Sequence, residues 1–225
     1  MYSPFAIVCM GRTGSTLLAG LLDSHPEIEC RGELLGLQYG YVEHPGISRK
    51  AFLEHHAYTT NLPIRGFKMP LDWVFNHPGI FDDFAELGYR IIRLDRRNAL
   101  EHLVSIKLAQ TNTDWSSARH YTVQKTRVTP LELFTFIGAR NAYNVVLDRF
   151  SAPLANAHFH YEDLLRPQTQ EHLLNFLGAR GHPLIAQTTR QRSGTLAESI
   201  ENYPDLSREL SKTPYAPLLD AVYEL

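Results

Sequence analysis

The sequence contains few cysteines: only two, Cys9 and Cys30, occur in 225 residues. Two cysteines cannot form the dense disulfide framework of a small secreted protein. No group of His, Cys and Asp residues has the spacing of a metal site, and a bound metal is therefore not expected. We expect a chain that folds around one hydrophobic core in a reducing compartment.

Long apolar runs are also missing. No stretch approaches the ~20 apolar residues that a membrane-spanning helix needs. The first apolar run, residues 5–10, has no basic segment before it and ends at Gly11, which is not the pattern of a signal peptide. The sequence therefore predicts a soluble, cytoplasmic protein.

The charges are nearly balanced, with 22 basic and 24 acidic residues and a formal net charge of −2. This balance gives no overall attraction for nucleic acid or for an anionic membrane surface. Arginines outnumber lysines by 17 to 5. The planar fork of arginine suits phosphate and sulfate groups, although the base composition of a gene can produce the same bias.

Short apolar runs alternate along the chain with helical segments. This order predicts an α/β fold in three layers, with a mainly parallel central sheet flanked by helices, in a single domain spanning residues 1–225. In such sheets ligands bind beyond the carboxyl ends of the strands. Segments 36–60 and 111–130 are interpreted either as insertions around a site or as surface loops. Strands are predicted at 5–10, 64–68, 89–94 and 157–161, and helices at 15–23, 98–110, 131–149, 168–177 and near the C-terminus.

The first chemical motif is FAIVCMGRTGSTLL, residues 5–18. A strand that enters a glycine turn and then a helix at Ser15 directs backbone N–H groups and a positive dipole end at one point, which favours an anion. The ATP-binding P-loop needs a lysine directly before its Ser or Thr, and here none precedes Ser15. Arg12 supplies charge from inside the loop instead. The motif therefore suits phosphate or sulfate better than Mg-ATP; a tight structural turn is the alternative interpretation.

A second motif, residues 89–110, has the order strand, basic turn, helix. Asn98 followed by Glu101 is typical of a helix N-cap. Arg97 directly precedes this cap, and Ser105 lies two turns further along the same face. An arginine at a helix N-terminus opposes the macrodipole unless an anion is present, so an ordinary amphipathic helix is the less favoured alternative. Two anion sites indicate a ligand with two separated anionic groups.

The stretch GRTGSTLLAGLLDSHPEIECRGELL, residues 11–35, resembles the 5′-phosphosulfate loop of sulfotransferases that use 3′-phosphoadenosine 5′-phosphosulfate (PAPS). The similarity is to the branch with the trehalose-type, nodulation-factor-type and tyrosylprotein enzymes. It implies a P-loop-like fold, PAPS as donor and the bisphosphate PAP as product. Arg97 and Ser105 have the eight-residue spacing with which the family holds the 3′-phosphate. The loop residues implied to hold the phosphosulfate are Arg12, Thr13, Gly14, Ser15 and Thr16.

The resemblance also implies catalytic roles. Glu33 matches the glutamate that takes the proton of the acceptor hydroxyl; without the resemblance, a surface carboxylate paired with Arg31 would be the simpler interpretation. Lys68, in RGFKMP, matches a lysine that would act with Arg12 on the charge that develops as the S–O bond breaks, the alternative being a solvent-exposed lysine. Competing candidates for the base are His25, His77, Glu27 and Glu29.

Two later segments resemble the family less specifically. HFHYEDLL, residues 158–165, implies that Tyr161 lies near the adenine; core packing is the alternative. TRQRSGTLAESIENY, residues 189–203, implies that Arg192, or else Arg190, contacts the 3′-phosphate.

Together these motifs predict an enzyme that transfers a sulfuryl group from PAPS to a hydroxyl of a carbohydrate or glycolipid acceptor. A P-loop kinase or nucleoside triphosphatase, and a nucleotide-binding module without catalysis, are the alternatives. They are distinguished by whether Glu33, Arg12 and Lys68 converge at the anion loop. The sequence leaves open the acceptor and whether the chain forms a homodimer.

Overall fold

The computed structural model of the chain describes residues 2–36, 41, 46–55, 57–113, 121–188 and 194–220. The chain divides into two compact units. Unit 1 comprises Met1–Asp95 and Arg149–Gln187, and unit 2 comprises Arg96–Asp148 and Thr188–Leu225. Each unit has a hydrophobic core of its own. The expectation that all 225 residues form a single domain stays a prediction.

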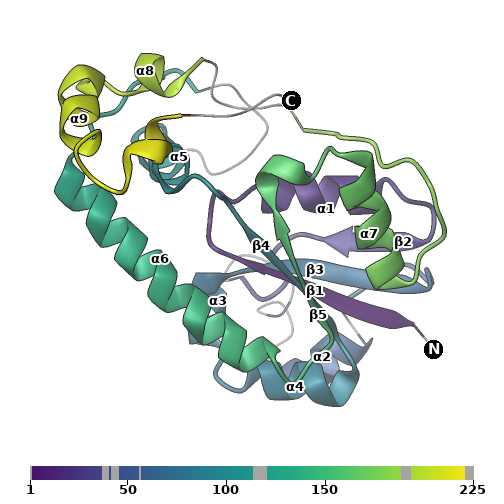
Figure 1. Cartoon of the computed structure of the whole chain (residues 1–225). Helices are drawn as coiled ribbons and strands as arrows, with labels where there is room; N and C mark the ends of the chain where they lie inside the picture. The colour runs from purple at the N-terminus through teal and green to yellow at the C-terminus, as the bar shows by residue number, and fades with distance from the viewer. Residues whose placement is uncertain are drawn as a thin grey trace. The chain divides into compact units, whose positions relative to one another are not determined.

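Unit 1 contains a five-stranded sheet in the order β2-β3-β1-β4-β5, in which every neighbouring pair is parallel (Figure 1). The central strand β1 is buried on both faces, as its continuous apolar sequence predicts. The α/β fold with a parallel central sheet is therefore confirmed. The strands are β1 (Ser3–Cys9), β2 (Ile28–Arg31), β3 (Ile64–Pro70), β4 (Arg90–Asp95) and β5 (Asn156–His160).

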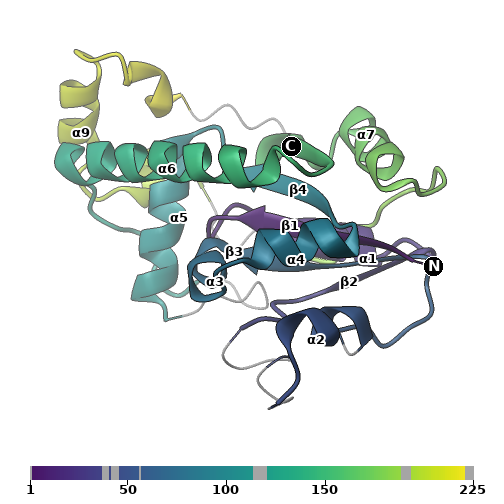
Figure 2. The same ribbon diagram turned by 90° about the horizontal axis from the view of Figure 1, so that it is seen from below.

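Helices cover both faces of this sheet. Helices α1 (Ser15–Asp23) and α7 (Pro167–Leu177) lie on one face, and α3 (Leu71–Asn76) and α4 (Ile80–Leu87) lie on the other (Figure 2). Helix α2 (Arg49–His55) is joined to α4 by ion pairs from Arg49 to Asp83 and from Lys50 to Glu86. A short 3₁₀ helix, η2 (Tyr161–Asp163), follows β5 directly.

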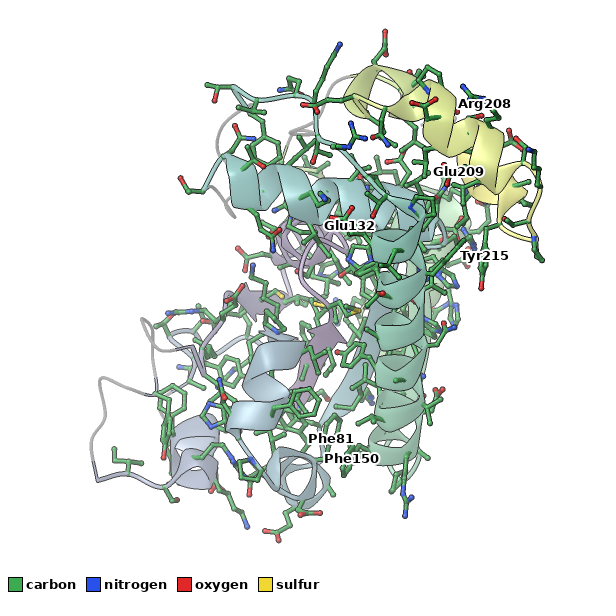
Figure 3. The ribbon with its side chains drawn as sticks, turned by 90° about the vertical axis from the view of Figure 1, so that its left-hand side faces the viewer. Phe81, Glu132, Phe150, Arg208, Glu209 and Tyr215 are labelled. Atoms are coloured by element: carbon green, nitrogen blue, oxygen red, sulfur yellow. The ribbon has the colours of Figure 1, made fainter. Side chains whose placement is uncertain are left out.

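The core on the α1–α7 side depends on one glycine of the sheet. Phe5 and Gly66 are opposite each other on β1 and β3. A Cβ atom at Gly66 would lie 2.4 Å from the Phe5 ring, well inside van der Waals contact. The absence of a side chain at position 66 therefore makes room for the buried Phe5 ring. On the opposite face, Phe67 packs against Phe84, and Phe81 stacks on Phe150 with ring centroids 5.5 Å apart (Figure 3).

Unit 2 is built from helices. Its core collects apolar side chains from α5, α6, α8 and α9, together with buried Tyr121 and Val128. Thr126 and Ile200 form an isolated parallel bridge, and the Tyr215 ring lies 5.0 Å from that of Phe134. The elements are α5 (Ala99–Thr111), α6 (Pro130–Ser151), whose last turn belongs to unit 1, α8 (Leu196–Ser199), α9 (Tyr203–Leu210) and the 3₁₀ helix η3 (Ala216–Leu219).

Each predicted strand and each predicted helix has an observed counterpart. Helix α1 has the predicted bounds. Strand β2 and helices α3 and α4 were not predicted, and helix α2 lies within residues 36–60, which were interpreted as an insertion around a site or as a surface loop. Tyr161, predicted as the last residue of a strand, begins the 3₁₀ helix η2 instead. Among the residues that the structure describes, every helix is too short or too polar to cross a bilayer.

Candidate functional site

The predicted anion loop connects β1 to α1. Gly14 is the N-cap of α1 with φ of 88°, and Arg12 also has a positive φ of 66°. Thr13 is fully buried, and its hydroxyl donates to the Met10 carbonyl at 2.8 Å, which closes the loop. The first turn of α1 contains no acidic residue. Backbone N–H groups and the positive end of the helix dipole therefore meet at the loop, an arrangement that fits an anion.

Cys9 lies beneath this loop and is completely buried. Burial raises the pKa of its thiol, while hydrogen bonds with the Ser15 and Thr13 hydroxyls oppose the rise. Both hydroxyls are thus engaged on the inner side of the loop. The third hydroxyl predicted to hold the anion, that of Thr16, differs from those of Thr13 and Ser15 because it accepts a hydrogen bond from a cation.

That cation is Lys68. Its Nζ atom lies 3.1 Å from Thr16 Oγ1 and 3.1 Å from Glu33 Oε1. Lys68 is opposite Ile7 on the neighbouring strand, and its side chain therefore projects to the face that α1 covers. Glu33 follows β2 by two residues, and β2 pairs with β3. The parallel sheet therefore brings Thr16, Glu33 and Lys68 together at the carboxyl ends of its strands.

The backbone strengthens the link between Glu33 and Lys68. The Lys68 N–H donates to the carbonyl of Gly32 at 3.3 Å, and the Gly36 N–H donates to the carbonyl of Glu33 at 3.0 Å. The side chains of Lys68 and Glu33 are 17% and 32% exposed, so the pair is partly covered but reachable by a substrate. The carboxylate and the ammonium group are thus held beside the loop by both backbone and side chain.

Tyr161 also lies at the loop. A Cβ atom on Gly14 would be 2.2 Å from Cδ2 of the Tyr161 ring. The ring therefore packs directly against the backbone of the loop, and Gly14 is required both for its positive φ and for this contact.

His25, a competing candidate for the base, is in a structural position. It is 2% exposed, its Nε2 atom lies 3.0 Å from the Arg180 carbonyl, and its Nδ1 atom accepts from the Glu27 N–H at 3.1 Å. It follows the C-terminal end of α1, whereas the anion loop precedes the N-terminal end. Both ring nitrogens are used in joining chain segments.

Glu29, another competing candidate for the base, holds the loop that contains Thr59 and Thr60. Its carboxylate accepts hydrogen bonds from the backbone and the hydroxyl groups of both Thr59 and Thr60, at 2.6–3.1 Å. Burial alone raises the pKa of Glu29, but these hydrogen bonds outweigh it and lower the pKa to about 2. Arg31 lies 3.5 Å from Glu29 and donates to Thr59. The basic partner of Glu33 in the structure is thus Lys68, not the sequence neighbour Arg31.

The second predicted motif belongs to unit 2. Asn98 caps α5 by accepting from the Glu101 N–H at 3.0 Å, as predicted, and its amide donates to the Leu218 carbonyl at 2.9 Å. Arg97, two residues after β4, is exposed, and Ser105 on α5 is half-buried. Arg192 and Arg190 lie outside the described residues. The other predicted site residues, among them Arg12, Glu33, Lys68 and Tyr161, belong to unit 1.

Sequence reasoning missed three features around this site. They are the thiol of Cys9 under the loop, the attachment of Glu29 to Thr59 and Thr60, and a contact from His77 to the turn that carries Glu33. The last two join residues that are distant in the sequence, so their proximity depends on the sheet or on a loop that packs against it. The apolar run around Cys9 was the one available signal, because it predicted a short buried strand over residues 5–10.

Comparisons with known proteins find similar sulfotransferase and nodulation protein sequences. The Sulfotransferase family model matches residues 4–79, the segment that contains the loop, Glu33 and Lys68. Nodulation protein H of Rhizobium tropici is 29% identical over 248 residues, covering 96% of this chain and 93% of that protein. Nodulation protein H of Rhizobium meliloti is 27% identical, covering 95% of this chain and 93% of that protein.

Two solved structures share the fold. A sulfotransferase from Alicyclobacillus acidocaldarius superposes with a TM-score of 0.57 at 16% identity, covering 98% of this chain and 95% of that one. The sulfotransferase domain from the curacin biosynthetic pathway has a TM-score of 0.52 at 18% identity, covering 88% and 82%. The relatives match along nearly the whole length and the family model matches the loop segment, and together these similarities support a sulfotransferase enzyme related to the nodulation-factor type.

Proposed function

We propose that the protein transfers a sulfuryl group from PAPS to a hydroxyl of a carbohydrate or glycolipid acceptor, with Glu33 as general base. The observation that carries this proposal is the position of Lys68. Its ammonium group contacts both Thr16, in the anion loop, and Glu33. A base and a donor-binding loop that share one cation are suited to a reaction in which an acceptor is deprotonated next to a bound anion.

The residues of unit 1 fit the anionic 5′ end of the donor. The loop offers backbone N–H groups at the N-terminus of a helix whose first turn has no acidic residue. Arg12, Thr16 and Lys68 add a guanidinium, a hydroxyl and an ammonium group, while Thr13, Gly14 and Ser15 contribute backbone. Tyr161, against Gly14, is proposed to contact the adenine. In unit 2, Arg97, Ser105 and Arg192 are proposed to bind the 3′-phosphate.

PAPS supplies a sulfuryl group on a good leaving group, so the chain itself needs little covalent chemistry. As the acceptor oxygen bonds to sulfur, the bond from sulfur to the bridging oxygen breaks, and the hydroxyl proton passes to the Glu33 carboxylate. The negative charge left on the bridging oxygen is stabilised by Lys68 and Arg12. The acceptor class follows the resemblance to the trehalose-type and nodulation-factor-type enzymes.

The two alternatives are less well supported. A kinase P-loop places its lysine inside the loop, whereas here the lysine comes from β3, and the Ser15 hydroxyl is engaged with Cys9. A nucleotide-binding module without catalysis does not require a carboxylate and an ammonium group in contact beside the loop.

The test is a calorimetric titration with PAP and, separately, with ATP and magnesium. We expect PAP to bind tightly to the wild type and at least about 10-fold more weakly to Arg97→Ala, because one charged contact to a phosphate contributes ~1.5–3 kcal/mol. Arg127→Ala, which removes another exposed arginine of unit 2, is the matched control and should bind PAP normally. Tighter binding of Mg-ATP than of PAP would contradict the proposal.

Transfer itself is measured with sulfur-labelled PAPS and a panel of oligosaccharides and glycolipids. Incorporation of the label into one class of hydroxyl, with PAP released in equal amount, is the expected result. Label that is released only as inorganic sulfate in the presence of every acceptor would contradict the acceptor class.

A further inference from the structure

The side chain of His77 reaches back to the turn that carries Glu33. His77 follows α3, which itself follows β3 and Lys68. Its Nε2 atom lies 3.0 Å from the carbonyl oxygen of Leu35. A carbonyl oxygen only accepts, so Nε2 must carry the hydrogen in this contact. The bond is therefore compatible with the neutral and the charged ring alike, and Nε2 is unsuited to accept the proton of a substrate.

The Glu33 turn is held at four successive carbonyl groups. Three of them, those of Gly32, Glu33 and Leu34, accept from backbone N–H groups of Lys68, Gly36 and Tyr41, respectively. The fourth, that of Leu35, accepts from the His77 ring. The side chains of Leu34 and Leu35 are 5% and 3% exposed. The turn is thus held by the buried side chains of Leu34 and Leu35 and by hydrogen bonds to its carbonyl groups. The last of these carbonyl groups, that of Leu35, is bonded by the side chain of His77.

The His77 ring is itself well fixed. Its centroid lies 6.1 Å from that of Tyr41 in an edge-on arrangement, and Tyr41 packs on the buried Phe52 of α2. The backbone of His77 donates to Val74 and accepts from Ile80. The ring is therefore a rigid donor, and it connects the end of α3 to the Glu33 turn.

We propose that His77 is a positioning residue for sulfuryl transfer, which holds the Glu33 turn so that the carboxylate stays at Lys68 Nζ. The inference rests on the proposed function, in which Glu33 is the base. Segments 32–36 and 68–77 are joined by the bond between Lys68 N–H and Gly32, by the pair of Lys68 and Glu33, and by His77. Loss of the third link leaves two, so the fold is retained while the end of the Glu33 turn is no longer held and the carboxylate is positioned less precisely.

Three substitutions separate the hydrogen bond from the bulk of the ring. In His77→Gln the amide nitrogen has about the reach of Nε2, whereas in His77→Asn it is one methylene shorter, and His77→Leu has no donor. We expect kcat to fall about 10- to 100-fold in the Asn and Leu variants, since a misplacement of ~1 Å costs about that much. His77→Gln should stay within about threefold of wild type. His55→Leu, at an exposed histidine of α2, is the control for loss of an imidazole.

Binding of the donor distinguishes positioning from a general loss of structure. The Kd for PAP should stay within about twofold of wild type in every His77 variant, because the bonds of His77 in the described part of the chain go to Leu35, Val74 and Ile80 and not to the loop at residues 11–16. If the Leu variant fails to fold, the Asn and Gln pair still provides the comparison. A His77→Asn enzyme with wild-type kcat, or a His77→Gln enzyme as slow as His77→Asn, would overturn the inference.

The double variant shows whether His77 acts through Glu33. Added to Glu33→Gln, His77→Asn should lower kcat no further, because the group it positions has already lost its function. An additional loss of the full size would mean that His77 acts elsewhere. If Glu33→Gln alone keeps wild-type turnover, the base assignment fails; if it is inactive while His77→Asn is unaffected, only the present inference fails.

Discussion

The Lys68 ammonium group lies 3.1 Å from the Glu33 carboxylate. Such a contact on an open surface contributes little to stability, because water screens both charges. Here the lysine also contacts Thr16 of the anion loop, so one cation joins the carboxylate to the loop. In the proposed mechanism the carboxylate takes the proton of the incoming hydroxyl, and the ammonium group stabilises the charge left on the bridging oxygen.

Replacement of Glu33 by Gln should lower kcat about 10²- to 10⁴-fold, because a positioned general base contributes that much and the amide cannot take the proton. The Kd for PAP should change less than about twofold. Glu27→Gln is the control, since Glu27 pairs with the exposed Arg180 beyond the other end of α1. The measurement is steady-state transfer with sulfur-labelled PAPS, and equal turnover in both variants would contradict the role of Glu33.

Replacement of Lys68 by Gln should lower kcat/KM at least about 100-fold, the usual effect of removing one group that stabilises developing charge. Unlike Glu33→Gln, the Lys68→Gln substitution should also weaken the binding of PAP, because Lys68 contacts Thr16 of the loop. Lys50→Gln removes a lysine from the exposed pair with Glu86 and should have no effect. A Lys68→Gln enzyme with normal PAP binding and normal kcat/KM would contradict a role for Lys68 in donor binding and catalysis.

Gly14→Ala should disrupt the anion loop. Its φ of 88° is strained for alanine, and the new Cβ atom would lie 2.2 Å from the Tyr161 ring. We expect a lower melting temperature and PAP binding weaker by at least about 10-fold. Gly20→Ala is the matched control in the same helix, where the nearest atom would be 3.9 Å away. That variant should be neutral or slightly more stable, because alanine favours the helix by up to ~1 kcal/mol. Equal melting temperatures for the two variants would contradict the strain at Gly14.

Local signals explain what the sequence predicted correctly. Helix α1 was bounded by the glycine turn before Ser15 and by the Ser-His-Pro turn after Asp23, and both boundaries were observed. The apolar run of β1 predicted a short buried strand, and the loop between this strand and α1 followed from its two neighbours. The Asn98 cap was likewise predicted from neighbouring residues in the sequence, and the hydrogen bond that its side chain accepts from the Glu101 N–H was observed.

Contacts between distant residues explain what was missed. The strand IECR of β2 alternates apolar with charged residues, but it is only four residues long, so its strand signal is weak. In the alternative interpretation of Glu33 its partner was Arg31, two residues away, whereas the parallel pairing of β2 with β3 places Lys68 next to Glu33. His77 was considered as a base because histidine is a common one; its contact with Leu35, 42 residues away, could be found only from the fold.

The attachment of Glu29 to Thr59 and Thr60 predicts a dependence of stability on pH. In the folded protein the pKa of Glu29 is lowered from 4.5 to about 2, so the ionised form stabilises the fold. This contribution is present above pH ~4.5 and is lost as the pH falls from there towards about 2. At ~1.4 kcal/mol for each pH unit, it is at most about 3.5 kcal/mol, and the side chain is only 5% exposed to screening by water.

Glu29→Gln should therefore lower the free energy of unfolding by about 2–3 kcal/mol at pH 7, measured by urea denaturation, because the amide cannot accept all four hydrogen bonds. The difference from wild type should be constant between pH 7 and pH 5 and should shrink below pH ~4.5. Glu132→Gln is the informative control: the pKa of Glu132 is also about 2, but its side chain is 44% exposed beside Lys107. Screening should limit its effect to below ~1 kcal/mol. Equal losses in the two variants, or a Glu29→Gln difference that does not change with pH, would mean that the four hydrogen bonds of Glu29 do not stabilise the fold in the way the geometry indicates.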